Sequence, residues 1–302
     1  MPIPDRTPGG FSNRLSDLEL EYFEIDSERV GDRFALSVSL PNGHAEAEGP
    51  LPVVYALDAQ FHGGLYEKLH RAFSGAEAAV RMLPFVQVNV GYPTDTGVDP
   101  LITRNRDLVP PNEPVPEVLR EFMQLHADAG LGDEGVETFF AMLENTHADR
   151  FLGFLEEELH PQIVDAYGVH EKDAGLFGFS YGGLFAIYAL VSGGDIFSRF
   201  GAASPGLMGD EASMFGAYRE FARSQDGTAR ERGLHLTIGG AEMWGPHRLL
   251  REMGIQTARF YDLTQNVPTP NLSVTADYFA GEDHETGAVD AYRSFVRRFY
   301  TA

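Results

Sequence analysis

The chain has 302 residues, 43% of them hydrophobic, and carries a formal net charge of −22 with no cysteine. Such a charge repels phosphate backbones and anionic lipid headgroups, which argues against nucleic-acid and membrane-surface roles. The absence of cysteine excludes disulfides, thiolate nucleophiles and cysteine-bound metal centres.

The chain opens with two expected strands, at 18–25 and 33–40, in which apolar and polar residues alternate. Gly31 and Asp32 lie at the turn between them, and a Pro-Asn-Gly sequence at 41–43 ends the second strand. Alternation with a period of two is typical of strands with one face on the core and one face in water. We therefore predict an antiparallel hairpin at the start of the chain.

After the hairpin the pattern changes to short apolar runs separated by stretches of helical character. Mostly apolar runs bounded by turn residues are typical of strands buried on both faces, and strands alternating with helices predict a parallel sheet. We predict strands at 53–57, 85–90, 174–177, 234–238 and 273–279, with helices at 64–82, 151–167, 183–192, 246–253 and 288–300. The predicted fold class is α/β, a mostly parallel, doubly wound sheet in a single domain over 1–302.

One segment, 95–145, does not fit this alternation. It contains four prolines between 110 and 116, several glycines and an acidic, partly helical remainder. Long excursions between core elements usually form lids or binding loops. We interpret the segment as an insertion that acts as a lid or substrate-binding element.

The most informative motif is Gly-Phe-Ser-Tyr-Gly-Gly at 178–183, which joins an apolar strand directly to an apolar helix. Gly-x-Ser-x-Gly alone is a weak pattern, but a sharp strand–serine–helix turn needs small neighbours because the two backbones approach closely there. The motif predicts Ser180 as a nucleophile. The amide of Tyr181, at the start of the helix, is a candidate oxyanion donor.

A serine nucleophile needs a base, and a third group to orient that base. Among ten histidines, His284 follows the last predicted strand and precedes the last helix, which matches the order of serine first and histidine last. Glu242 follows the strand at 234–238 and is the leading candidate for the acid. Asp262 is the competitor, Asp283 is too close to His284 in sequence to reach it, and a Ser–His dyad stays open.

A second oxyanion donor is expected after the strand at 53–57, where the backbone amide of Ala59 or Gln60 is the candidate. His62, in the same loop, could line the pocket or lie partly exposed.

Taken together, these motifs resemble the putative-esterase family of α/β hydrolases, which includes siderophore esterases, S-formylglutathione hydrolases and mycolyltransferases. The similar stretches lie at 55–60, 89–94, 104–110, 178–183, 204–205, 239–242 and 281–285. Ala59 stands where the family usually has glycine, which puts the shape of the oxyanion loop in question. The resemblance implies the α/β-hydrolase fold and an ester-cleaving serine.

Three further residues are candidates for substrate contacts. Arg104 and Arg106 could anchor an anionic group, since arginine binds carboxylates bidentately. The alternative is a local ion pair from Arg104 to Asp107. Trp244, the only tryptophan, could wall the pocket or simply pack.

The sequence therefore predicts hydrolysis of a small-molecule carboxylic ester or lactone, which needs no metal or organic cofactor. Acyl transfer by the same serine and a non-catalytic binding protein on the same scaffold are the alternatives. The first ten residues lack the apolar core of a secretory signal, and no run is long enough to span a membrane. We expect a cytoplasmic protein, although a processed secreted chain would look the same. The oligomeric state is left open.

Overall fold

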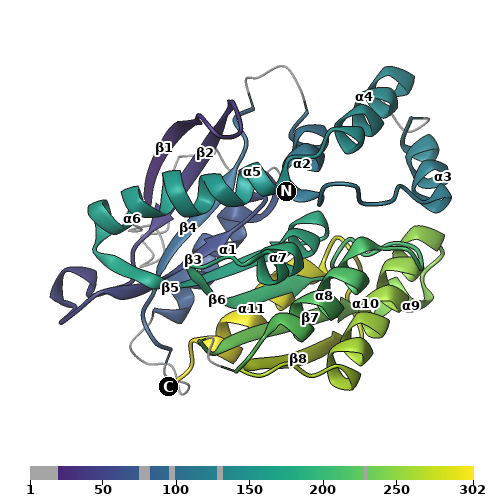
Figure 1. Cartoon of the computed structure of the whole chain (residues 1–302). Helices are drawn as coiled ribbons and strands as arrows, with labels where there is room; N and C mark the ends of the chain where they lie inside the picture. Colours follow the sequence, from purple (N-terminus) through teal and green to yellow (C-terminus); the bar gives the residue numbers. More distant parts are fainter. Residues whose placement is uncertain (1–19, 75–81, 95–98, 128–131, 228–229) are drawn as a thin grey trace, which may run out of the picture.

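One sheet of eight strands organises the part of the chain that the computed structural model describes, namely residues 20–74, 82–94, 99–127, 132–227 and 230–302. The strand order is β1-β2-β4-β3-β5-β6-β7-β8 (Figure 1). β1 pairs antiparallel with β2, β2 pairs antiparallel with β4, and the six strands from β4 to β8 are parallel. The strands are β1 (Leu20–Ser27), β2 (Asp32–Ser39), β3 (Leu51–Ala56), β4 (Val86–Gly91), β5 (Val169–Phe179), β6 (Phe197–Ala203), β7 (Arg232–Gly239) and β8 (Leu272–Phe279).

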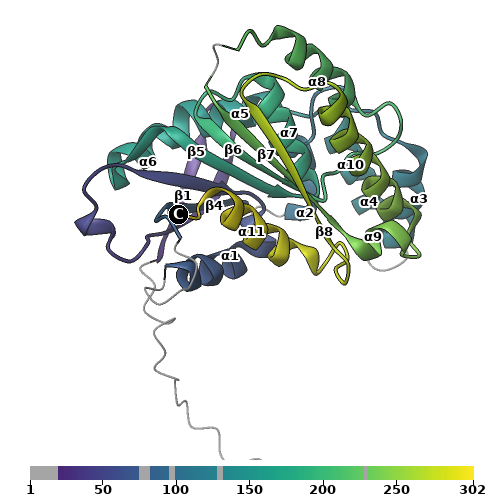
Figure 2. The same cartoon turned by 90° about the horizontal axis from the view of Figure 1, so that it is seen from below.

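Helices cover both faces of this sheet, as a doubly wound α/β fold requires. α1 (Ala59–Phe73) and α11 (Gly287–Phe299) lie on one face, as Figure 2 shows. The opposite face carries α5 (Ala148–Gly153), the π-helical segment η3 (Phe154–Leu159), α6 (His160–Tyr167), α7 (Tyr181–Ser192), α8 (Ser213–Ser224) and α10 (Arg248–Asn266). The predicted fold class and the opening hairpin are confirmed.

The hydrophobic core lies in two layers, one on each side of the sheet. β3 contributes to both, since Val53 and Tyr55 belong to the cluster under α7 while Val54 and Ala56 belong to the cluster under α1 and α11. Successive side chains of a strand point to opposite faces, so a strand apolar at every position has to be buried on both sides. This is why the central strands read as continuous apolar runs.

The expected insertion holds α2 (Pro100–Leu108), α3 (Glu117–His126) and α4 (Gly132–Glu144), with residues 95–98 and 128–131 outside the described parts. α3 and α4 stand beside the sheet rather than on it (Figure 1). Glu113, just before α3, accepts a hydrogen bond from the Ser213 amide at 3.2 Å and another from the Ser213 hydroxyl, which ties the segment to the start of α8. Two short helices lie outside the insertion, η1 (His44–Glu46) and α9 (Gly240–Trp244).

Several elements differ from the sequence prediction, and glycines lie at two of the differences. α1 begins at Ala59 rather than at 64, and α10 continues to Asn266, past Gly254, rather than ending at Met253. Glycine lowers helix propensity by about 1 kcal/mol, but a Cβ on Gly254 would lie 2.6 Å from Met243 Sδ. The residue that weakens the local helix signal thus lies directly against the Met243 side chain. The end of the predicted 64–82 helix falls partly on 75–81, outside the described residues.

The strand β6 and the helix α8 were not predicted. β6 contains Gly201, where a Cβ would lie 2.6 Å from the rings of both Phe177 and Phe295. A glycine and two alanines give β6 a weak strand signal, and at Gly201 only a residue without a Cβ fits between these rings. Among the described residues, no helix is long and apolar enough to cross a membrane.

Candidate active site

Ser180 occupies a sharp turn between β5 and α7. Its backbone has φ 59° and ψ −119°, a conformation that is strained for a residue with a side chain. A Cβ on Gly178 would lie 2.1 Å from Gly182 O, and one on Gly183 would lie 2.7 Å from Ala203 O. The glycines around Ser180 are therefore needed because strand, helix and the neighbouring β6 approach each other closely at this turn.

Backbone hydrogen bonds hold this turn on both sides. The Ser180 amide donates to Ala203 O at 2.9 Å, and the Gly206 amide donates to Ser180 O at 2.8 Å. Tyr181 is the first residue of α7, and the amides of the first turn of a helix have no partner inside the helix. The Tyr181 amide is thus available at the position where an oxyanion donor is expected.

His284 and Glu242 come together across 42 positions of the sequence. His284 lies in the loop between β8 and α11, and its Nδ1 is 2.5 Å from Glu242 Oε1 on α9. The other carboxylate oxygen of Glu242, Oε2, accepts from the Ser204 hydroxyl at 2.7 Å and from the Gly239 amide at 2.8 Å. Glu242 is 1% exposed. A buried carboxylate that accepts from three donors is held in one position.

The other two acidic candidates lie elsewhere. The Asp283 carboxylate accepts from the amides of Glu285 and Thr286, both at 2.9 Å, and so shapes the start of α11. Asp262 is exposed on α10 and lines a separate surface hollow with Asp210 and Arg259. Neither carboxylate is hydrogen-bonded to His284, whose ring packs on Phe179 at 4.8 Å between centroids.

Ser180 and His284 line the same cavity, which has a volume of about 490 Å³. Its walls are mostly apolar and come from four helices as well as from the turn at Ser180. The insertion supplies Leu101, Arg104 and Asn105 from α2, Leu119, Phe122 and Met123 from α3, and Phe139 from α4. The remaining lining residues are Tyr181, Gly206, Met208, His247, Leu249, Leu250, Met253 and Glu285.

The loop after β3 begins at Asp58, which has a left-handed backbone with φ 59°. Ala59 and Gln60 are the first residues of α1, and Asp58 O accepts from the amides of Phe61 and His62, so the Ala59 and Gln60 amides are left without a helical partner. The alanine at 59 fits without strain, since it has an ordinary helical backbone.

Asp58 and Arg104 form a buried ion pair that the sequence reasoning missed. Arg104 Nε donates to Asp58 Oδ1 and Nη2 donates to Asp58 Oδ2, both at 2.6 Å, and the two side chains are 7% and 3% exposed. The expected local pair of Arg104 with Asp107 is therefore wrong. Asp107 pairs instead with Arg106. Burial would lower the pKa of Arg104, but the charge of Asp58 raises it above its ordinary value. The sequence feature that could have suggested this ion pair is Asp58, which lies in the stretch at 55–60 that resembles the putative-esterase family.

The other expected substrate contacts lie away from this cavity. Arg106 is bound by Asp107 at 2.8 Å and by Asp32 at 2.9 Å and is not among the lining residues. Trp244 is 71% exposed and packs edge-on against Tyr278, so it does not wall the pocket. The His62 ring packs against Tyr66 and Phe179, each at 5.8 Å, and burial lowers the pKa of His62.

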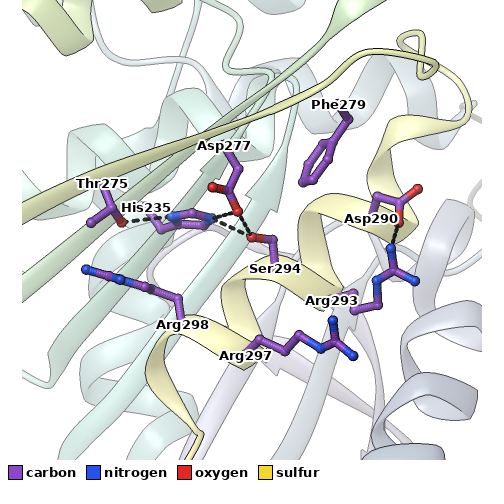
Figure 3. Close-up of a pocket in the computed structure, with 9 residues that line it drawn as sticks. All are labelled: His235, Thr275, Asp277, Phe279, Asp290, Arg293, Ser294, Arg297 and Arg298. Atoms are coloured by element: carbon purple, nitrogen blue, oxygen red, sulfur yellow. Dashed lines mark hydrogen bonds and ion pairs between the residues drawn. The ribbon is translucent and has the colours of Figure 1, made fainter.

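A second cluster of serine, histidine and aspartate side chains lies between β7, β8 and α11 (Figure 3). His235 Nδ1 lies 2.9 Å from Thr275 Oγ1, and His235 Nε2 lies 2.9 Å from Ser294 Oγ, which also donates to Asp277. Asp277 thus sits at the same ring nitrogen as the serine, whereas a serine-activating acid sits at the opposite nitrogen. This cluster joins two strands to a helix and does not activate Ser294.

In the described ranges, histidine, aspartate and glutamate side chains do not gather into a group of three that could hold a metal ion.

A family model described as Putative esterase matches residues 137–291, about half of the 302 residues. Ferri-bacillibactin esterase BesA of Bacillus subtilis is 29% identical over 206 residues, which cover 67% of this chain and 64% of that protein. The siderophore triacetylfusarinine C esterase of Aspergillus fumigatus is 28% identical over 193 residues, covering 62% of this chain and 56% of that one. This chain thus aligns with somewhat less than two thirds of either relative's length.

Solved structures of similar shape agree with the fold. The siderophore hydrolase EstB of Aspergillus nidulans has a TM-score of 0.73 with 21% identity and covers 98% of both chains. An IroE-like serine hydrolase from Shewanella oneidensis has a TM-score of 0.74, also with 21% identity, and covers 93% of this chain and 80% of its own. At this level of identity the likeness establishes the fold.

Proposed function

The chain belongs to the Putative esterase family, and on that premise we propose that it is a serine hydrolase that cleaves a small-molecule carboxylic ester or lactone. The observation that carries the proposal is the juxtaposition of three groups. Ser180, in a strained turn, lines one cavity with His284, whose Nδ1 is 2.5 Å from the buried Glu242.

Each residue has a distinct role in this proposal. Because His284 Nδ1 donates to Glu242, Nε2 is the nitrogen left to take the proton of the Ser180 hydroxyl as Ser180 Oγ attacks the ester carbonyl. His284 then returns the proton to the leaving alcohol, and water releases the acyl group by the same steps. The negative charge of Glu242 stabilises the imidazolium that forms in each half of the reaction.

The oxyanion would be held by backbone amides on two sides. Tyr181 supplies one from the start of α7, and Ala59 or Gln60 supplies the other from the start of α1. Both helices direct their positive ends toward the same region, which favours the charge that develops in the transition state. Removing one such donor typically lowers kcat by about 10²–10³-fold.

The side chains that line the cavity indicate which kind of ester it would bind. Its walls are mostly leucine, methionine and phenylalanine side chains, which favour an ester with an apolar acyl or alcohol group. Two relatives are named as esterases of ferri-bacillibactin and of the siderophore triacetylfusarinine C, which supports a siderophore ester or lactone as a candidate substrate.

The test is hydrolysis of p-nitrophenyl acetate and butyrate by the wild type and by Ser180→Ala, His284→Ala and Glu242→Ala. Loss of the nucleophile or the base should lower kcat by about 10⁴-fold or more, and loss of the acid by less. If the Glu242 variant keeps full activity, the site works as a dyad.

Ser294→Ala is the matched control, because it removes a serine from the other serine–histidine–aspartate cluster and should leave kcat unchanged. Wild-type activity that survives Ser180→Ala would refute the proposal. A chain that neither cleaves these esters nor reacts at Ser180 with a fluorophosphonate would instead be a binding protein on this scaffold.

A further inference from the structure

The ring of Phe179, the residue directly before Ser180, packs against two imidazoles. Its centroid is 4.8 Å from that of His284, with 45° between the ring planes, and 5.8 Å from that of His62 near the start of α1. Phe179 is 5% exposed and ends β5, where it pairs with Ala203 of β6. The ring therefore projects from a rigid strand toward the histidine that is proposed as the base.

A hydrogen bond alone does not fix the orientation of the His284 ring. Glu242 Oε1 holds Nδ1 at 2.5 Å, but the imidazole can still tilt about this bond, and tilting moves Nε2, the atom that has to receive the Ser180 proton. A misplacement of about 1 Å in such a site can lower the rate by about 10²-fold. A second contact on the ring restricts this tilt, and Phe179 supplies one.

The same contact acts on the charge that forms during the proposed reaction. When the Ser180 proton moves to Nε2, His284 becomes a cation whose ring centroid lies 4.8 Å from that of Phe179. An aromatic ring attracts a cation within about 6 Å of its centroid, and more strongly where water is excluded. A neutral imidazole gains less from the ring than an imidazolium does. The contact is thus stronger in the transition state than in the ground state, and interactions of that kind raise kcat.

Plain core packing is the alternative explanation for a buried phenylalanine, and Phe177 offers the comparison. Phe177 lies two positions earlier on the same face of β5 and belongs to the same buried cluster as Phe179. Its ring packs on those of Tyr66, Tyr292 and Phe295, at 5.5, 5.2 and 5.4 Å between centroids. Phe177 thus fills the core under α1 and α11, whereas the ring of Phe179 meets the imidazoles.

Resting on the proposed function, we propose that Phe179 is a positioning residue for the reaction. Its ring holds the imidazole of His284 in the orientation that presents Nε2 to Ser180 Oγ, and it stabilises the imidazolium for as long as His284 carries the Ser180 proton. Phe179 is not among the residues that line the cavity of Ser180, so it acts through His284.

Phe179→Leu tests this inference, and Phe177→Leu is the matched control in the same strand and cluster. Both changes should lower the unfolding temperature, since each shortens a buried side chain. With p-nitrophenyl butyrate, Phe179→Leu should lower kcat about 10–100-fold and leave KM nearly unchanged. The acid midpoint of its kcat/KM–pH profile should move to lower pH, because the imidazolium loses its aromatic neighbour. Phe177→Leu should change neither kcat nor this midpoint.

Fluorinated phenylalanines, introduced at position 179 alone, test the charge effect at nearly constant shape. Mono-, di- and trifluorination of the ring edge make its face steadily less negative, which weakens its attraction for a cation. We expect kcat to fall stepwise, by about 3–10-fold over the series, and the acid midpoint to fall with it. Trifluorophenylalanine at 177 should have no effect. This series also keeps the inference testable if Phe179→Leu does not fold.

Wild-type kcat and an unmoved acid midpoint in Phe179→Leu and in the fluorinated series would overturn the inference. So would an equal loss of kcat in Phe177→Leu, since the effect would then belong to the core. A loss in Phe179→Leu with a flat fluorinated series would overturn the stabilisation of the imidazolium. Failure of the proposed function looks different, because Ser180→Ala and His284→Ala would then cleave the ester as fast as the wild type.

Discussion

The Arg104→Met substitution should be among the most damaging single changes in this protein. It removes the guanidinium that binds Asp58 through two hydrogen bonds of 2.6 Å and leaves a carboxylate with 3% exposure and no countercharge. Breaking a buried ion pair by removing one partner costs about 3–5 kcal/mol, because the remaining charge stays buried without compensation. We expect a loss of that size in the free energy of unfolding.

The double variant Asp58→Asn/Arg104→Met tests whether the pair itself is responsible. Replacing both charges removes the uncompensated carboxylate, so the double variant should be more stable than Arg104→Met alone, and the two effects should be strongly non-additive. Urea unfolding gives these free energies. Arg33→Met is the control, since it breaks exposed pairs with Glu24 and Asp26 and should cost at most about 1 kcal/mol.

The same pair should matter for the proposed reaction. Asp58 directly precedes the Ala59 and Gln60 amides, and Arg104 Nη2 also reaches Phe179 O, next to Ser180, at 3.4 Å. Both variants should therefore lower kcat for p-nitrophenyl butyrate, by up to the 10²–10³-fold typical of a lost oxyanion donor. An Arg104→Met protein with unchanged unfolding free energy and unchanged kcat would refute the reasoning.

Three further predictions follow. Burial lowers the pKa of His70 and His235 from 6.5 to about 4, so the unfolded chain takes up their protons first and stability falls as pH drops from about 6.5 to 4. Urea unfolding at pH 7 and 5 should differ by roughly 2 kcal/mol per histidine, and His235→Gln should remove its own share of that difference. Ser204→Ala removes a donor to Glu242 and should lower kcat about 10-fold, as one charged hydrogen bond would, with no change in KM. Trp244→Ala should leave both kinetic constants within about twofold, because surface changes of this kind are nearly neutral.

The parts of the fold that the sequence predicts well are those in which local and tertiary requirements agree. β5 is apolar because it is buried on both faces, and the turn after it has glycines because strand and helix nearly touch, so the position of Ser180 could be read directly. His284 could be found because chain order and a loop between a strand and a helix together select one histidine.

Other parts depend on contacts that no local pattern records. The partner of Arg104 was expected three residues away at Asp107, but it lies 46 positions back at Asp58. Asn105 gave no signal either, since an asparagine among charged residues suggests a surface helix. Its burial comes from the packing of α2 against α4, α5 and α7, which is a property of the fold and not of its sequence neighbours.

The arrangement of the site follows from the order of the parallel strands. β3, β5, β6, β7 and β8 are consecutive neighbours in the sheet, and the residues that follow their carboxyl ends are Asp58, Ser180, Ser204, Glu242 and His284. Parallel strands bring these ends to one edge, where binding sites of such sheets form. Ser204, which follows the strand between those of Ser180 and Glu242, is thereby placed to hold the carboxylate. The His235 cluster contains similar residue types but lies along β7 and β8 under α11 (Figure 3). There Ser294 and Asp277 meet the same ring nitrogen of His235, so the cluster can stabilise the sheet but does not activate a serine.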